Sequence, residues 1–262
     1  MQRFSSDELR TAVRDRYAAV ARGQGTECGC GPSCCGPAAS SADTSRALGY
    51  SAEELAQAPE GSILGLGCGN PQAIASLKPG ETVLDLGSGG GFDCFLAARA
   101  VGAQGRVIGV DMTADMVSLS RKNAAKAGTA TVEFRLGEIE HLPVADSSVD
   151  VINSTCVINL TPDKPQVFRE AFRVLKRGGR LAVSDTVASA PIPDELKADL
   201  ASYSACVTGS ASVDELQSML SEAGFRDIRI RPREESRQFI RGWSPDQGVE
   251  NFILSASIEA VK

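Results

Sequence analysis

Several residue types and patterns are scarce in this chain of 262 residues. It has one histidine and one tryptophan, aromatic residues make up 5% of it, and its apolar runs are only a few residues long. A membrane span needs about 20 apolar residues, and the first residues, MQRFSSDELR, lack a basic-then-apolar leader pattern. We therefore expect a soluble, cytoplasmic protein without a membrane partner. The single imidazole also nearly excludes a His-rich metal site.

Positive charge is not in excess either. Lys and Arg total 27 against 33 Asp and Glu, so the net charge is -6, which argues against a nucleic-acid partner. A chain of this length buries roughly 70–75% of its unfolded surface and needs no disulfides for stability, and cytoplasmic thiols stay reduced. The eight cysteines therefore indicate soft-ligand or redox chemistry if they indicate any.

The N-terminal region divides into two segments of different composition. Apolar residues at helical spacing predict an amphipathic helix over 6–21. The next segment, 23–45, is dominated by Gly, Ser, Pro, Ala and Cys and has no periodicity that buries a face, so we expect a mobile, functional loop. We assign residues 1–60 to this helix and cysteine-rich segment.

From residue 82 onward, short apolar strands alternate with helical stretches, which is typical of a parallel sheet covered on both faces. The C-terminal part adds two helices and then two strands joined without a helix, which predict an antiparallel hairpin. Together they predict a doubly wound, mostly parallel α/β sheet of seven strands, with a core over 61–190 and a completing part over 191–262. The expected strands are 82–86, 106–110, 132–136, 149–154, 180–185, 227–231 and 252–260, and the later helices are 114–127, 164–175, 194–206 and 213–223.

The strongest local motif is the glycine-rich turn VLDLGSGGGFD at 83–93. Such a turn after a first strand lets a ligand approach the backbone and the next helix N-terminus. A dinucleotide fingerprint would require a third glycine where Phe92 stands, and a purely structural turn is the plainer alternative. The spacing instead resembles motif I of the class I S-adenosylmethionine-dependent methyltransferases. The candidate donor-binding residues of this turn are Asp85, Gly87, Ser88 and Gly89.

Further donor-binding candidates follow the second and third strands. Asp111 ends the second strand about 20 residues beyond the glycines, where a carboxylate accepts both ribose hydroxyls. The same resemblance implies that Asp85 faces the methionine part of the donor, that Met112 covers the adenine, and that Glu138 and Ile139 hold it. We expect His141 to be a surface loop residue.

Three cysteines distant in sequence are expected to meet at the same edge of the sheet. Cys156 follows the fourth strand at its carboxyl end, where open α/β sheets bind ligands. Cys68 lies in a turn-rich segment before the first strand, and Cys206 follows the fifth. A small buried hydrophobe is the plainer interpretation of any single cysteine, and we keep it for Cys94. Three thiolates without harder ligands suit arsenic(III), whose lone pair can act as nucleophile.

Consecutive segments also resemble one family closely, the bacterial arsenite S-adenosylmethionine methyltransferases. The resemblance covers roughly residues 48–226 and implies that Cys68, Cys156 and Cys206 bind arsenic. It also implies a fourth, redox-active cysteine among Cys28, Cys30, Cys34 and Cys35, of which we favour the Cys34–Cys35 pair. The implied partners are arsenite or methylarsenite and a thiol reductant, glutathione or thioredoxin. The segments are GYSAEEL, LGLGCGNP, GETVLDLGSGGGFDCFLAA, VIGVDMT, EFRLGEIEHLPV, CVINLTPDK and FREAFRVLKRGGRLAVSD.

The chain departs from the family pattern at a few positions. Thr155 stands where the family usually has Asn, the usual Gly-Ala near the third cysteine is replaced by Thr208, Gly209 and Ser210, and a long C-terminal extension of some relatives is lacking. We predict methyl transfer from S-adenosylmethionine to thiolate-bound arsenic, an arsenic detoxification activity. The alternatives are a class I methyltransferase for another small molecule and a thiol-based metalloid-binding protein without turnover; a nicotinamide dehydrogenase is the weakest.

Overall fold

A twisted sheet organises the chain, whose computed structural model describes residues 4–24, 40–59, 61–244 and 247–262. Its strand order is β3-β2-β1-β4-β5-β8-β7, and the two-residue β6 pairs with β5. Strands β1 to β5 pair in parallel, whereas β8 is antiparallel to both of its neighbours. The predicted doubly wound, mostly parallel sheet is thus confirmed, and β6 is an eighth strand in addition to the seven expected. The strands are β1 (Thr82–Leu86), β2 (Arg106–Asp111), β3 (Val132–Leu136), β4 (Val149–Thr155), β5 (Leu175–Ala188), β6 (Ala211–Ser212), β7 (Arg226–Arg233) and β8 (Ile253–Val261).

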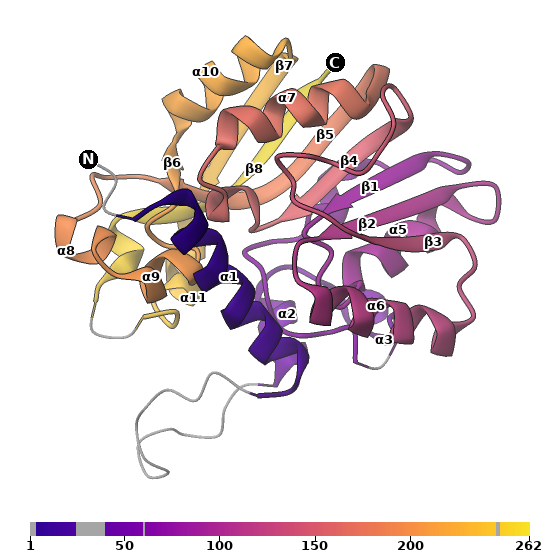
Figure 1. The fold of residues 1–262 in the computed structure, drawn as a ribbon, viewed down its shortest axis with the longest axis horizontal. Coiled ribbons are helices and arrows are strands. Elements are labelled where there is room, and N and C mark those ends of the chain that lie inside the picture. The colour runs from indigo at the N-terminus through magenta and orange to yellow at the C-terminus, as the bar shows by residue number, and fades with distance from the viewer. Residues whose placement is uncertain (1–3, 25–39, 60, 245–246) are drawn as a thin grey trace.

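Helices cover both faces of the sheet (Figure 1). Helices α7 (Lys164–Val174) and α10 (Val213–Ala223) cover one face, and α4 (Gln72–Ala75), α5 (Phe92–Val101) and α6 (Ala114–Ala127) cover the other. Because both faces are covered, the central strands are buried at almost every position rather than at alternate ones. The strand order reverses between β1 and β4, which opens a crevice at their carboxyl ends.

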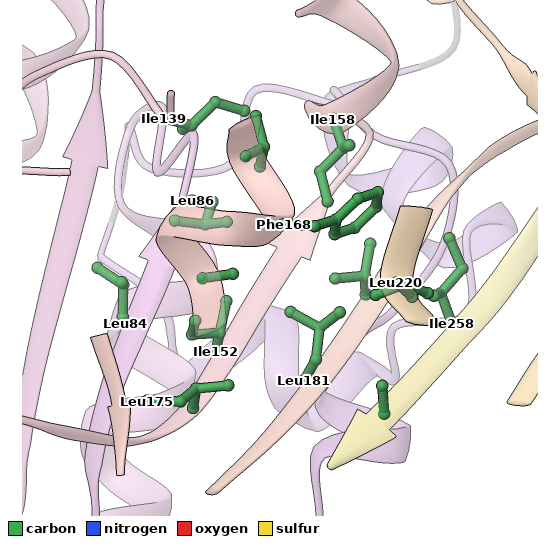
Figure 2. Close-up of a cluster of buried hydrophobic side chains, with 14 of the residues drawn as sticks. Leu84, Leu86, Ile139, Ile152, Ile158, Phe168, Leu175, Leu181, Leu220 and Ile258 are labelled. Carbon is green, nitrogen blue, oxygen red and sulfur yellow. The ribbon is translucent and has the colours of Figure 1, made fainter. Parts of the chain in front are cut away.

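Each face of the sheet packs against a hydrophobic core, and the larger of these two cores lies between the sheet and helices α7 and α10. Figure 2 shows Phe168 of α7 pointing into a group of aliphatic side chains from the strands. Phe168, Leu181 of β5 and Leu220 of α10 are all almost completely buried. This packing fixes the strand ends that carry the site.

The N-terminal helix α1 (Ser6–Ala21) has the bounds that the apolar spacing predicts. Ser5 and Glu8 form a capping box at its start. The helix packs against α9 (Leu200–Ser204) and α6, so it lies across the carboxyl ends of the strands. Two short helices, α2 (Ser41–Ala47) and α3 (Ala52–Gln57), precede the turns that lead into β1. The described residues hold no helix that is long and apolar enough to cross a bilayer.

The C-terminal part differs from the prediction in two places. The single helix expected over 194–206 is two helices, α8 (Asp194–Lys197) and α9, because extended backbone at Asp199 breaks the helix and its side chain caps α9. The prediction that no helix lies between β7 and β8 was also wrong. It contains α11 (Arg237–Ile240) with the turns η2 (Glu234–Ser236) and η3 (Val249–Asn251). Ile240 and Val249 are fully buried in a small separate core, which a tight hairpin turn could not supply.

Truncating Phe168 tests how much the larger core contributes. Phe168→Ala removes a ring with no exposed surface and is expected to lower the free energy of unfolding by about 3–5 kcal/mol. Leu136→Ala is the control because Leu136 is 55% exposed, and it should change stability by at most about 0.5 kcal/mol. Urea unfolding followed by circular dichroism measures both, and equal effects would contradict the packing described.

Candidate active site

A cavity of about 1080 Å³, open mouth included, lies at the carboxyl ends of β1, β2 and β4. The glycine turn after β1, the ends of β2 and β4, the turn after β3 and one face of α1 all contribute to its wall. The cavity therefore occupies the crevice at which the strand order reverses.

The glycine turn brings backbone, rather than side chains, to the cavity. Gly87 has a φ of 70°, and a Cβ there would clash with the side chain of Val157. The amide of Gly89 donates to Oδ2 of Asp111 at 2.9 Å. The hydroxyl of Ser88 is buried at the cavity wall without a partner among the described residues. An unpaired buried hydroxyl costs free energy unless a ligand supplies its partner, so this turn is suited to bind one.

Asp111 at the end of β2 has the position expected of a ribose-binding carboxylate. Its Oδ1 accepts the amide of Thr113 at 2.8 Å, while Oδ2 accepts that of Gly89. Burial raises the pKa of Asp111 and these backbone hydrogen bonds oppose that rise. The carboxylate is thus held in one orientation at the cavity wall.

Two further carboxylates lie beneath the turn. Asp85 is 2% exposed and accepts a hydrogen bond from Sγ of Cys94 at 3.1 Å. Asp93 accepts from the Tyr50 hydroxyl at 2.9 Å and from Oγ1 of Thr155 at 3.1 Å. Burial raises the pKa of Asp93 to about 6, and burial with the charge of Asp93 raises the pKa of Asp85 well above its ordinary value. Among the described residues, no cationic side chain contributes to the pKa of Asp85 or Asp93. The two buried carboxylates therefore favour binding of a positively charged ligand.

The residues predicted to contact the adenine lie in different environments. Ile139 and Met112 line the cavity, as does every predicted residue of the glycine turn. Glu138 is not among the lining residues, because its carboxylate pairs with Arg14 of α1 at 2.7 Å and with Arg10 at 3.6 Å. Its role in donor binding stays a prediction.

Glu140, two residues further on, is a site residue that the sequence analysis missed. Its side chain is almost completely buried at the cavity wall. It accepts hydrogen bonds from Arg10 at 2.9 Å and from Oγ1 of Thr161 at 2.6 Å. The motif Glu138-Ile139-Glu140 contains two candidate acids, and sequence alone does not show which one faces the cavity. His141 is exposed, as expected of a loop residue.

The structure brings Cys68, Cys156 and Cys206 into one buried cluster against α1, with exposures of 0%, 4% and 7%. Sγ of Cys206 donates to the carbonyl of Cys156 at 3.5 Å, and Sγ of Cys68 donates to that of Ser184 at 3.3 Å. Of the three, only Cys156 lines the donor cavity. Cys94 lies apart in the core beneath the glycine turn, and the Cys34–Cys35 pair lies outside the described residues.

Hydrogen bonds from distant strands hold the backbone of Cys68. Its carbonyl accepts the guanidinium of Arg233 at 2.9 Å and the hydroxyl of Ser255 at 2.5 Å. Arg233 belongs to β7 and Ser255 to β8. The position of the first thiol therefore depends on the last two strands.

The backbone at two of these thiols is strained. Cys156 and Cys206 have φ angles of 56° and 65°, in the left-handed region that side chains other than glycine rarely adopt. Such strain persists only where surrounding contacts impose it, and it is frequent at functional sites.

Contacts of the buried carboxylate of Asp185 impose part of this strained backbone conformation. One of its oxygens and the sulfurs of Cys68 and Cys156 lie within 4.8 Å of one another. Its Oδ2 accepts the amide of Ile158 at 2.8 Å, and its Oδ1 accepts the side-chain amide of Asn159 at 2.7 Å. Asp185 thus anchors the turn that follows Cys156. The sequence analysis missed it, although Asp185 stands at the carboxyl end of the fifth predicted strand.

The three thiols differ in acidity. Burial raises the pKa of Cys68, and burial together with hydrogen bonding to Cys206 raises that of Cys156 well above its usual value. Hydrogen bonding to Cys156 lowers the pKa of Cys206. Cys206 is therefore the thiol that gives up its proton most readily.

Comparison with known proteins agrees with this fold. The family model described as "Methyltransferase domain" matches residues 77–224. An arsenic (III) S-adenosylmethionine methyltransferase from Chlamydomonas reinhardtii superposes with a TM-score of 0.62 at 29% identity, over 84% of this chain and 73% of that one. The fold and the glycine-turn cavity thus define a class I S-adenosylmethionine-dependent methyltransferase.

Curated relatives narrow the assignment. The arsenite methyltransferase of Halobacterium salinarum is 51% identical over 98% of this chain and 67% of its own length. The human arsenite methyltransferase is 40% identical over 56% of this chain and 42% of its own length. The chain belongs to the arsenite methyltransferase family. It spans about two thirds of the length of the archaeal relative and less than half of the human one.

Substituting Gly87 tests the backbone approach to the donor. Gly87→Ala combines a positive φ with a clash against Val157 and should weaken S-adenosylmethionine binding by more than about tenfold, since a displaced turn loses its ligand contacts. Gly128→Ala is the matched control, because Gly128 has a φ of 63° with open space around it at the end of α6. Isothermal titration calorimetry measures both; equal losses would show that the effect is general strain.

The ionisation of Asp93 predicts a pH dependence of donor binding. Its pKa is raised to about 6, so below that pH the side chain becomes neutral and its attraction for the cationic donor is lost. The affinity should fall by up to about tenfold per pH unit below pH 6 and level off above pH 7. Asp93→Asn should remove this step in titrations from pH 5 to 8. An unchanged profile in the variant would assign the step to another group.

Proposed function

We propose that this chain transfers the methyl group of S-adenosylmethionine to trivalent arsenic held by Cys68, Cys156 and Cys206. The observation that carries the proposal is the meeting of these three buried thiols beside the donor cavity, with Cys156 in its wall. The naming of the relatives as arsenite methyltransferases supports it. In this chain the substrates would be arsenite and methylarsenite.

Each element of the cavity has a task in holding the donor. The glycine turn admits the donor to the backbone, Asp111 accepts the ribose hydroxyls, and Met112 and Ile139 pack against the adenine. Asp85 and Asp93 lie beneath the turn, where their charge attracts the cationic part. When bound, S-adenosylmethionine supplies a methyl carbon made electrophilic by its sulfonium. The protein contributes proximity and alignment more than acid–base catalysis.

The thiols supply the opposite half of the reaction. Three thiolate sulfurs around arsenic(III) leave its lone pair free, and the position of Cys156 in the cavity wall orients that lone pair toward the donor. No general base is needed at this step because the nucleophile carries no proton. Transfer of a methyl cation raises arsenic to the pentavalent state, so two electrons must return it to the trivalent state. A thiol reductant, glutathione or thioredoxin, supplies them, with Cys34 and Cys35 as the proposed intermediaries.

The decisive experiment follows methylated arsenic and S-adenosylhomocysteine together. The chain is incubated with S-adenosylmethionine, arsenite and glutathione, and products are separated by liquid chromatography with arsenic-specific mass spectrometry. We expect both products from the wild type. S-Adenosylhomocysteine from another acceptor without methylated arsenic would indicate a different methyltransferase, and tight arsenic binding without S-adenosylhomocysteine would indicate a binding protein.

Replacing one thiol tests the arsenic ligands separately from the donor site. Cys156→Ser removes a soft ligand but keeps the size of the side chain, and it should lower arsenic methylation by more than about a hundredfold because two thiolates hold arsenic less firmly and less well aligned. Donor affinity, measured on the same variant by calorimetry, should change by less than about threefold. Retention of the wild-type rate would exclude Cys156 as a ligand.

A further inference from the structure

Tyr17, on the N-terminal helix α1, contacts the thiol cluster in a way that the proposed function does not use. Its hydroxyl lies 3.8 Å from Sγ of Cys206, within hydrogen-bonding reach of a sulfur, and either atom can donate. Its ring packs against the cluster together with Trp243. The helix thus brings a hydroxyl group to one of the three sulfurs from a part of the chain remote from the glycine turn.

Tyr17 also connects Cys206 to the cavity. Tyr17 and Cys156 line the cavity, whereas Cys206 does not. An arsenic species that enters the cavity and bonds first to Cys156 therefore has the Tyr17 hydroxyl near it before Cys206 reacts. Tyr17 therefore belongs to the cavity wall and also contacts the third sulfur.

The chemistry of arsenic binding needs a proton transfer at this position. Arsenite enters as a trihydroxide, and each As–S bond formed from a thiol releases one water molecule. Hydroxide is a poor leaving group, so the thiol proton must reach the departing oxygen. A neutral hydroxyl that both accepts and donates a proton performs such a transfer well.

We propose that Tyr17 relays a proton from Cys206 to the hydroxide that leaves arsenic when the third As–S bond forms. In this step the S–H bond of Cys206 breaks and its proton goes to the oxygen of Tyr17. The Tyr17 proton passes to the departing hydroxide, which leaves as water. The As–O bond breaks, the As–S bond forms, and no oxidation state changes. This inference rests on the proposed function and concerns substrate loading, not methyl transfer.

Other groups around Cys206 are less suited to this role. Sγ of Cys206 donates to the backbone carbonyl of Cys156, which cannot pass a proton on. Asn159 directs its side-chain amide to Sγ of Cys156 and to Asp185, and an amide is a poor proton carrier. The hydroxyl of Tyr203 donates to the carbonyl of Leu160 at 3.0 Å. Tyr203 therefore provides a matched control in the same apolar cluster.

The test measures arsenic loading by the full chain in the absence of donor. Trp243, the single tryptophan of the chain, packs against the thiol cluster and serves as a fluorescent reporter in rapid mixing. Bound arsenic in quenched samples is counted independently by mass spectrometry. Arsenic is supplied either as arsenite or as its tris-glutathione complex. The complex releases a thiol, which is a better leaving group than hydroxide and needs less proton assistance.

We expect Tyr17→Phe to slow loading of arsenite by about tenfold or more, within the range of general acid–base effects. Loading from the glutathione complex should slow by less than about twofold, and Tyr203→Phe should load arsenite at close to the wild-type rate. Methyl transfer from preloaded Tyr17→Phe should equal that of the preloaded wild type.

Two results would overturn the inference alone. The first is loading of arsenite by Tyr17→Phe as fast as by the wild type. The second is equal slowing with both arsenic sources, which a merely misplaced helix would cause. A wild-type chain that neither binds arsenic nor forms methylated arsenic would instead overturn the proposed function, and the relay with it.

Discussion

The hydrogen bonds accepted by the buried carboxylate of Asp185 tie the ends of β4 and β5 together, and the thiol cluster depends on this link. Asp185 is 2% exposed, and it accepts backbone amides from the turn after β4 as well as the amide of Thr186 on its own strand. A buried charge is tolerable only with such compensation. Because the turn after β4 carries Cys156 in a strained conformation, removing the carboxylate would release the backbone strain at that sulfur.

Charge is distributed unevenly between the two halves of the site. The donor half has buried carboxylates at Asp85, Asp93 and Asp111, and burial raises the pKa of each. The thiol half combines the buried carboxylate of Asp185 with apolar side chains such as Leu9, Val13 and Leu160. The hydroxyl of Tyr17 and the side-chain amide of Asn159, which reach the sulfurs, are uncharged. Under the proposed function, a cationic donor and a neutral arsenic species would therefore bind in different parts of the site. Binding of the donor also relieves the mutual repulsion of the carboxylates, so the donor contributes to the stability of the fold.

The sequence predicted those features that depend on local patterns. The bounds of α1, β1, α6 and α10 follow from apolar periodicity, caps and glycine stops, and these agree with the structure. The glycine turn was identifiable because its backbone geometry favours glycine, and Asp85 was identified from the resemblance of the turn to motif I of the class I methyltransferases. The three cysteines were expected at one edge because parallel strands align their carboxyl ends.

What the sequence did not reveal depends on side-chain orientation and on long-range contacts. Glu138 and Glu140 are both acidic, and only the packing of Arg10 and Thr161 shows that Glu140 faces the cavity. Tyr17 reads as an ordinary apolar position of an amphipathic helix, and its contact with Cys206 spans 189 residues. The break at Asp199 was missed because its side chain competes with helix continuation in a way that apolar spacing does not register.

The bonds that Arg233 and Ser255 make to the carbonyl of Cys68 have a consequence for how the site forms. Cys68 precedes the first strand, whereas Ser255 belongs to the last, so the thiol and the group that holds it are 187 positions apart in the sequence. During synthesis the donor-binding turn can form once β1, β2 and β4 have paired. The thiol cluster cannot be complete until β8 has joined the sheet. A nascent chain would therefore complete its glycine-turn pocket first and bring its three thiols together only at the end of folding.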